Sequence, residues 1–122
     1  MGIKIESDKI MLKFTAGADI SKGQVVYVSG DNEVSPATDA DAAKCVGVAD
    51  NDASAGEEVY VIIYGKATVV ADGAISAGDR VRAASTAGRV VSESTCNDSC
   101  IGIALSAASA AGESLTILVT KL

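Results

Sequence analysis

The three cysteines, Cys45, Cys96 and Cys100, are the side chains best suited to covalent or redox chemistry in this chain of 122 residues. Because the chain has no histidine, it cannot form Ser-His-Asp or Cys-His catalytic arrangements, and it lacks the usual ligand set of a zinc site. No basic residue lies next to Cys96 in the sequence to activate its thiol as a nucleophile. We expect Cys45 and Cys100 to be small buried hydrophobic side chains, with a disulfide between Cys96 and Cys100 as the alternative.

Two acidic pairs, Asp39 with Asp41 and Asp50 with Asp52, are the other candidates for a chemical site. The second pair begins a stretch that loosely resembles a calcium-binding loop. The twelfth position of that loop is Val61, which cannot supply the carboxylate that a calcium loop needs there. We therefore expect these carboxylates to be solvated loop charges, and we predict no catalytic residue, no metal site and no cofactor.

The charge balance excludes further classes of partner. The chain carries 16 acidic and 10 basic residues, for a net charge of −6. An acidic surface repels the phosphates of nucleic acids and of anionic lipids, so we predict neither nucleic acid nor a membrane as a partner. No apolar run approaches the about 18 residues of a membrane span, and the first residues lack a secretory signal pattern. These features predict a soluble protein that is made in a cytoplasm.

The sequence motifs that indicate strands and turns, which would position any site, occur twice along the chain. Three blocks recur in the same order, at an offset of 55 residues for the first two blocks and 56 for the third. The pairs of blocks are ISKGQVV (20–26) with ISAGDRV (75–81), KCVGVA (44–49) with SCIGIA (99–104), and AGEEVYVII (55–63) with AGESLTILV (111–119). The pattern predicts two β-rich units of about 50 residues that pack together around a pseudo-two-fold axis.

We therefore predict an all-β fold, a small duplicated β-barrel or sandwich with an extended N-terminal arm. The arm and first strand occupy residues 1–15, and a single β domain over 16–122 contains the repeats, about 17–66 and 73–122. In the first repeat, 57–64 is the longest predicted strand, and residues 66–71 lead into the second repeat. The alanine-rich stretch 104–111 has helical propensity, but its counterpart in the first repeat is a polar loop, so we predict a loop. Residues 38–43 are predicted to form one helical turn with Thr38 as its N-cap.

Two apolar patterns are candidates for intermolecular contact. The stretch 9–15 alternates and predicts a half-buried strand, and the arm before it is apolar at every second residue near its start. The strand 57–64 is apolar on both faces, which indicates burial either within the chain or between subunits. The candidate contact residues are Ile3, Ile5, Ile10, Leu12, Phe14, Tyr60, Ile62 and Tyr64.

The order of the motifs resembles that of tailed-phage and prophage head decoration proteins, also called capsid cement proteins. In both, a glycine turn leads into a strand, a VGVA or IGIA strand follows, and an AGE turn opens a long apolar strand. The resemblance covers about residues 16–122. It implies a small β-barrel-like protein on the outer capsid surface of an icosahedral phage head. Its implied partners are the major capsid protein, whose subunits it stabilises, and itself, as a homotrimer.

The mechanism that we expect is additive, because a trimer makes several modest contacts with the capsid at once. The arm 1–15 would contribute by adding a strand to the sheet edge of a neighbour. A carbohydrate-binding or adhesion module displayed on a particle surface is the alternative function, with Phe14, Tyr27, Tyr60 and Tyr64 as the available aromatic side chains. A biotinyl or lipoyl carrier domain is a weaker alternative, since the hairpin tips 30–33 and 85–88 carry no lysine.

Overall fold

The computed structural model describes residues 3–6, 8–95 and 99–120, with the backbone alone for residues 3–6. This part of the chain forms ten strands and one short 3-10 helix. In chain order they are β1 (Ile3–Glu6), β2 (Lys9–Ala16), β3 (Val25–Gly30), β4 (Glu33–Pro36), η1 (Asp39–Lys44), β5 (Cys45–Ala49), β6 (Glu58–Val70), β7 (Arg80–Ala83), β8 (Val90–Ser92), β9 (Cys100–Ala104) and β10 (Ser114–Val119). The predicted all-β class is confirmed.

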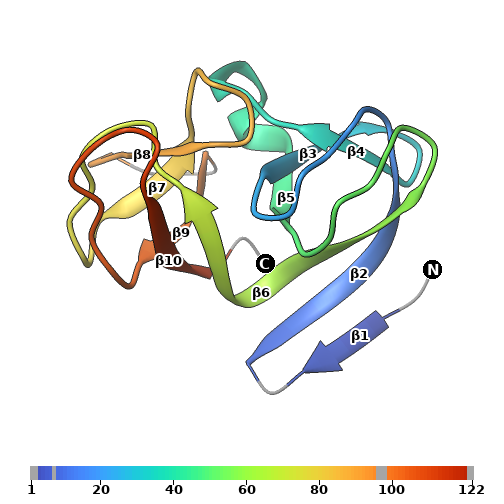
Figure 1. The fold of residues 1–122 in the computed structure, drawn as a ribbon, viewed down its shortest axis with the longest axis horizontal. Helices are drawn as coiled ribbons and strands as arrows, with labels where there is room; N and C mark the ends of the chain where they lie inside the picture. Colours follow the sequence, from blue (N-terminus) through green and yellow to red (C-terminus); the bar gives the residue numbers. More distant parts are fainter. Residues whose placement is uncertain (1–2, 7, 96–98, 121–122) are drawn as a thin grey trace.

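Five strands close into a barrel in the first half of the chain (Figure 1). They follow one another in the order β2, β4, β3, β5 and β6, and β6 pairs back with β2 to complete the ring. All of these pairs are antiparallel except β2 with β4, which run parallel where Thr15 and Ala16 lie opposite Glu33 and Val34. Closure leaves these strands without long open edges. The predicted barrel is therefore confirmed.

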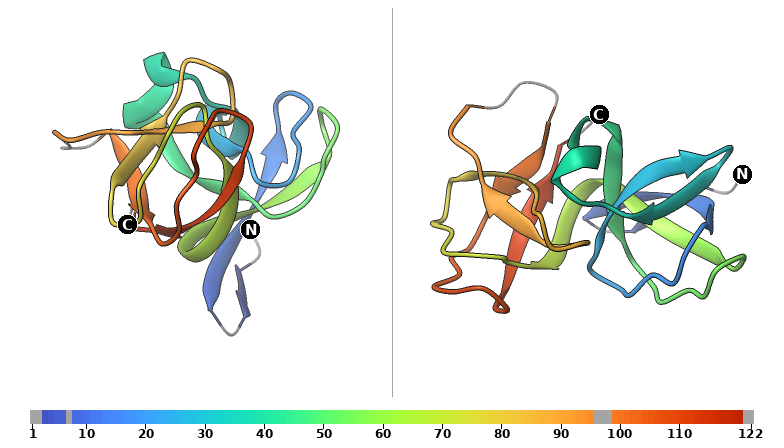
Figure 2. Two further views of the ribbon diagram at one scale, coloured as in Figure 1. Left: turned by 60° about the vertical axis from the view of Figure 1, so that its left-hand side comes forward. Right: turned by 90° about the horizontal axis from the view of Figure 1, so that it is seen from above.

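The second half of the chain extends the same sheet from β6 through β10, β9, β7 and β8. A parallel bridge between Ala71 and Val90 brings the end of β6 next to β8. Seen from above, the strands β7 to β10 form a second lobe beside the barrel (Figure 2). The two lobes share β6.

The shared strand β6 is continuous over 13 residues. The sequence analysis predicted that this strand ends at residue 64, and this prediction is wrong, because the strand continues to Val70. Gly65 lies at the expected break, with a φ of 122°. A β-carbon on Gly65 would overlap the carbonyl oxygen of Asp8 and the Cα of Lys9, so only glycine allows the β1–β2 connection to approach β6 here. The glycine thus permits a close crossing instead of ending the strand.

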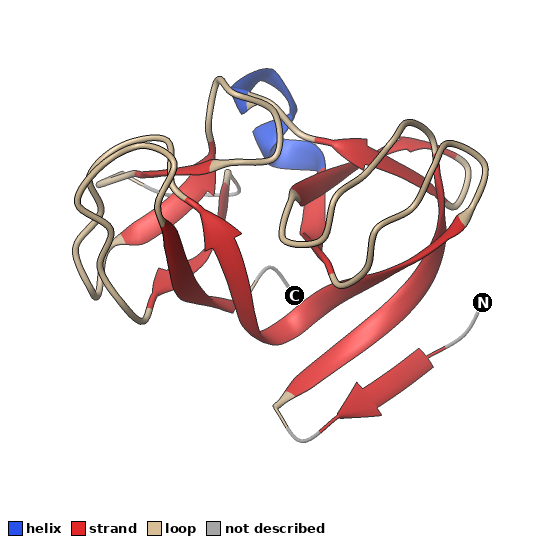
Figure 3. Ribbon diagram, in the orientation of Figure 1, coloured by secondary structure: helices blue, strands red, loops and turns tan. Residues whose placement is uncertain are grey.

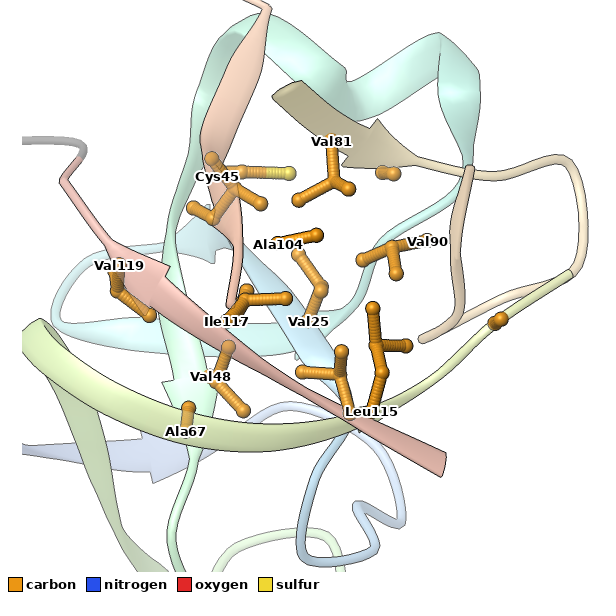
Figure 4. Close-up of a cluster of buried hydrophobic side chains, with 14 of the residues drawn as sticks. Val25, Cys45, Val48, Ala67, Val81, Val90, Ala104, Leu115, Ile117 and Val119 are labelled. Carbon is orange, nitrogen blue, oxygen red and sulfur yellow. The ribbon is translucent and has the colours of Figure 1, made fainter. Parts of the chain in front are cut away.

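Two hydrophobic clusters fill the lobes. The smaller one lies inside the barrel and consists of Ala16, Ile20, Val26, Val34, Ala49, Ala53, Val59 and Val61. The larger one fills the second lobe, and it also includes Met11, Val25, Val48 and Ile62 from barrel strands. Figure 4 shows Val25 and Val48 among side chains of the second lobe such as Ile117. The barrel therefore buries one of its outer faces against the second lobe, and this shared apolar area holds the lobes together.

The single 3-10 helix, η1, lies at the top of the molecule, where the two lobes meet (Figure 3). A carboxylate oxygen of Asp41 accepts hydrogen bonds from the backbone N–H of Thr38 at 3.1 Å and from its hydroxyl at 3.2 Å. These bonds fix the first turn of the helix. The predicted helical turn with Thr38 as its N-cap is confirmed.

The N-terminal segment pairs with the barrel. β1 runs antiparallel to β2, from Ile3 opposite Leu12 to Glu6 opposite Lys9. The resulting hairpin projects below the barrel in Figure 1. β2 itself is a barrel strand, so residues 9–15, which the sequence analysis grouped with the arm, belong structurally to the barrel.

The alanine-rich stretch that follows β9 contains no helix, as predicted. Its chain is held by an isolated antiparallel bridge between Ala108 and Ile75. The backbone N–H of each residue donates to the carbonyl of the other, at 2.8 and 2.9 Å. Tertiary pairing therefore overrides the helical propensity of these alanines.

We predict that Gly47→Ala destabilises the fold by about 1–3 kcal/mol, because the new methyl group would overlap the carbonyl oxygen of Ile62 on the neighbouring strand. Chemical denaturation measures the change. Gly73→Ala is the control, since a β-carbon there meets no atom within 4 Å. Equal stability of the two variants would contradict the close approach of β5 to β6.

Candidate interaction surface

Ile62, one of the predicted contact residues, lies in the core. Only 3% of it is exposed, and it belongs to the larger hydrophobic cluster. Its cross-strand neighbours, Met11 on β2 and Val48 on β5, are buried in the same cluster. The prediction that Ile62 contacts another subunit is wrong, since the second lobe of the same chain covers it.

Among the predicted contact residues whose side chains the structure describes, Tyr64 is the most open to solvent, at 45% exposure. It lies opposite Ile10 on β2, and Ile10 in turn lies opposite Ile5 on β1. These three positions form a row across β1, β2 and β6, and two of them belong to the projecting hairpin. The side chains of Ile3 and Ile5 lie outside the described residues, so their roles remain predictions.

The other predicted contact residues are half-buried. A bulge between Ile10 and Met11 shifts the register of β2. Beyond it, Leu12 and Phe14 lie opposite Val61 and Val59, two residues of the cluster inside the barrel, and Phe14 packs against that cluster. The residue skipped by this shift is Ile63 of β6, so the alternation of β2 itself continues. The second face of β2 is not polar throughout, because Met11 is fully buried in the larger cluster. Tyr60 also packs against the larger cluster.

Three exposed apolar side chains were not among the predicted contacts. Val28, Ile103 and Leu105 are 41%, 37% and 44% exposed. Ile103 lies on β9 and Leu105 directly follows that strand. One signal in the sequence could have identified this pair. Ile103 and Leu105 are two positions apart, so both side chains would point to the same face of a strand.

A cleft of about 480 Å³ opens where the barrel meets the second half of β6. Its apolar lining includes Val48, Ala49, Ile62 and Ala67, which come from β5 and from both halves of β6. The cleft therefore depends on the continuity of β6 through Gly65, because that strand forms part of both sides.

The polar lining of this cleft contains more basic than acidic side chains. It contains three lysines, two aspartates and two threonines: Lys9, Lys22, Lys66, Asp8, Asp50, Thr68 and Thr116. Lys9 forms an ion pair with Asp50 at 3.2 Å, and both side chains are about one-fifth exposed, at 23% and 18%. Thr68 and Thr116 lie opposite each other on β6 and β10. Sequence reasoning missed these lysines, because they lie far apart in the chain and share no motif.

Three of the four carboxylates that were expected to be solvated loop charges have structural roles. Asp52 accepts a hydrogen bond from the backbone N–H of Lys22 at 2.7 Å, and Asp50 pairs with Lys9. Asp41 caps η1. Within the described part of the chain, no group of three or more His, Cys, Asp or Glu side chains could hold a metal ion.

The glutamates of the two AGE motifs close their own turns. A side-chain oxygen of Glu57 accepts a hydrogen bond from the backbone N–H of Ser54 at 2.7 Å. Glu113 accepts from the N–H and the hydroxyl of Ser109 at 2.8 and 2.7 Å, and these bonds lower the pKa of its carboxyl group. On β2, a hydrogen bond and the charge of Glu58 raise the pKa of Lys13. These hydrogen bonds and this ion pair therefore stabilise the turns and strands that form the surface.

The cysteines differ from each other. Cys45 is buried, as expected, and its thiol donates a hydrogen bond to the carbonyl oxygen of Asp41 at 3.6 Å. Cys100 is half-buried and disulfide-bonded, so the expectation that it is a small buried hydrophobic side chain is wrong. Cys96, its predicted partner in the alternative, lies outside the described residues.

A closed five-stranded barrel with a second β lobe defines a small all-β domain. In the part of the chain that the structure describes, no helix is long and apolar enough to cross a membrane. The sequence matches the family model of phage cement proteins over residues 5–121, and the chain belongs to this family. Membership supports a structural role in the virion.

The fold is similar to that of the N base of the head fiber gp8.5 in bacteriophage phi29. The two share 20% sequence identity with a TM-score of 0.62, and the match covers 91% of this chain and 93% of that one. No curated protein sequence matches this chain. The structural likeness concerns the fold.

We predict that Ile62→Ala destabilises the protein by about 2–5 kcal/mol, because it leaves a cavity in the core. Tyr64→Ala should change stability by no more than about 0.5 kcal/mol, because its side chain is largely exposed. Thermal and chemical denaturation of both variants checks this contrast. A large loss for Tyr64→Ala together with a small one for Ile62→Ala would contradict the assignment of Ile62 to the core.

Proposed function

We propose that this chain binds the outer surface of an icosahedral phage head and stabilises contacts between major capsid subunits. The family match over residues 5–121 carries this proposal. After synthesis in the host cytoplasm, the protein becomes part of the virion. The proposal assigns it no enzymatic activity and no cofactor, and the lack of a metal-binding cluster among the described residues is compatible with that assignment.

We infer that the chain docks as a homotrimer. Among the described residues, exposed apolar side chains such as Tyr64 and Val28 lie on different strands, which favours several modest contacts over one large contact. Linking three copies raises the effective concentration of the second and third contacts once the first has formed. The major capsid protein and further copies of this chain are the proposed partners.

The proposed two-repeat organisation of the domain is supported by equivalent pairings in the two lobes. Val26 lies opposite Gly47 in the barrel, and Val81 lies opposite Gly102 in the second lobe. In both lobes the register shifts directly after this pair, between Val26 and Tyr27 in the barrel and between Val81 and Arg82 in the second lobe. The bridges between residues 20 and 53 and between residues 75 and 108 correspond in the same way. A duplicated unit has to preserve such backbone relations, because they fix its register.

We propose the β1–β2 hairpin as one docking element. β1 pairs only with β2 among the described strands, so its outer edge offers backbone groups for a further strand. The exposed Tyr64 lies in the row beside it. A capsid subunit or another copy of the chain would extend the sheet at this edge.

Sedimentation with empty heads assembled from the major capsid protein of the same phage tests the function. We expect the chain to co-sediment at a saturating ratio close to one copy per capsid subunit, and to raise the temperature at which the heads open. Deletion of residues 2–8 should weaken this binding while the barrel remains folded, as circular dichroism would report.

Heads that sediment without the chain would contradict a capsid-binding role. Binding that is unchanged by the deletion would remove the hairpin from the docking surface and leave the capsid role intact. Loss of β-structure in the deletion variant would show that the hairpin supports the fold, and Tyr64→Ala would then test the same surface.

A further inference from the structure

The cleft between the barrel and the second half of β6 concentrates positive charge on an acidic protein. Its three lysines and two aspartates sum to +1, whereas the whole chain carries −6, so the remaining residues carry −7. Lys9 is already paired with Asp50. In the described part of the chain, neither Lys22 nor Lys66 belongs to an ion pair. Both are exposed and available to an incoming anionic group.

The two available lysines are held on an ordered frame. The backbone N–H of Lys22 donates to Asp52 at 2.7 Å, which fixes the loop before β3. Next to it, the N–H of Gly23 donates to the carbonyl of Ala49 at 2.9 Å. Lys66 lies within β6, opposite Leu118 on β10. Binding therefore needs to order only the side chains, which lowers its entropic cost.

The lining of the cleft distinguishes between classes of anionic ligand. It contains no aromatic side chain among its described residues, so it offers no platform for a sugar ring or a base. The strongly acidic remainder of the chain opposes a nucleic acid, which would extend far beyond the cleft. A carboxylate side chain fits the lysines and the threonine hydroxyls of Thr68 and Thr116, whereas the apolar residues of the lining are themselves buried.

We propose that this cleft binds an acidic segment of the capsid protein, with Lys22 and Lys66 as its carboxylate-binding residues. The inference rests on the proposed function, because it assigns a docking site to the capsid contact. Charge complementarity is the argument for this occupant: an acidic segment is repelled by most of the surface and attracted at this cleft. The contact would therefore fix where and in which orientation the chain docks.

A peptide titration tests the cleft without any capsid. Tetraglutamate and tetraglutamine are added in turn to the isotopically labelled protein, and amide chemical shifts are followed by NMR. We expect tetraglutamate to shift the amides of Gly23, Lys66, Thr68 and Thr116, and added salt to reverse the effect. Tetraglutamine should leave these amides unchanged. Absence of shifts in the cleft, or equal shifts with both peptides, would overturn the proposal.

Charge reversal tests the same site on heads. The double variant Lys22→Glu/Lys66→Glu should weaken head binding by about tenfold or more. The matched control, Lys44→Glu/Arg80→Glu, makes the same change in net charge at exposed positions outside the cleft. We expect it to bind like the original chain. Circular dichroism confirms that both variants fold.

The outcomes separate the two proposals. If both double variants bind like the original chain, or both lose affinity equally, the cleft proposal is overturned and the capsid role stands. If the original chain itself does not bind heads, the proposed function fails. The peptide titration alone then decides whether the cleft recognises carboxylates.

Discussion

The architecture depends on one strand, β6, which belongs to both lobes. Its first half pairs with β2 and β5 to close the barrel, and its second half pairs with β10 to begin the second lobe. Both lobes need this strand to complete their sheets. Without it, backbone N–H and C=O groups of β2, β5 and β10 would lose their hydrogen-bond partners. The side chains of β6 also link the two hydrophobic clusters, since Val61 points into the barrel cluster and Ile62 belongs to the cluster that spans the lobes.

Continuity of β6 also creates the surface that is available for docking. Because the strand passes Gly65 without a break, Lys66 and Thr68 lie beside residues of the barrel and line one cleft with Lys9 and Lys22. β1 pairs with the edge of β2 that faces away from β6, and the exposed Tyr64 lies near this hairpin. A rigid body that presents an edge strand and a charged cleft is suited to a protein that binds a repeating lattice, where several copies add their contacts.

The barrel was predicted from the internal repeat and the family resemblance, and the alanine-rich loop from its counterpart in the first repeat, against its own helical propensity. Local patterns in the sequence predicted the β-class and the turn capped by Thr38, because both depend on neighbouring residues. They did not predict the continuity of β6, since Gly65 followed by Lys66 has the composition of a turn. The close approach of Asp8 and Lys9 that requires the glycine is a tertiary contact. In the same way, alternation identified Ile62 as apolar but could not show what covers it. The cleft lysines come together only through folding, so no local signal identified them.

Native-state hydrogen exchange tests most directly whether β6 joins the lobes into one cooperative unit. The amide of Ala49 in the barrel donates to the carbonyl of Gln24 at 2.9 Å, and the amide of Ala104 in the second lobe donates to that of Asp79 at 2.8 Å. Both residues are buried. A shared strand predicts that both amides exchange with one free energy, equal to that of global unfolding. Exchange of the Ala104 amide through an opening of much lower free energy, while the Ala49 amide keeps full protection, would contradict this account.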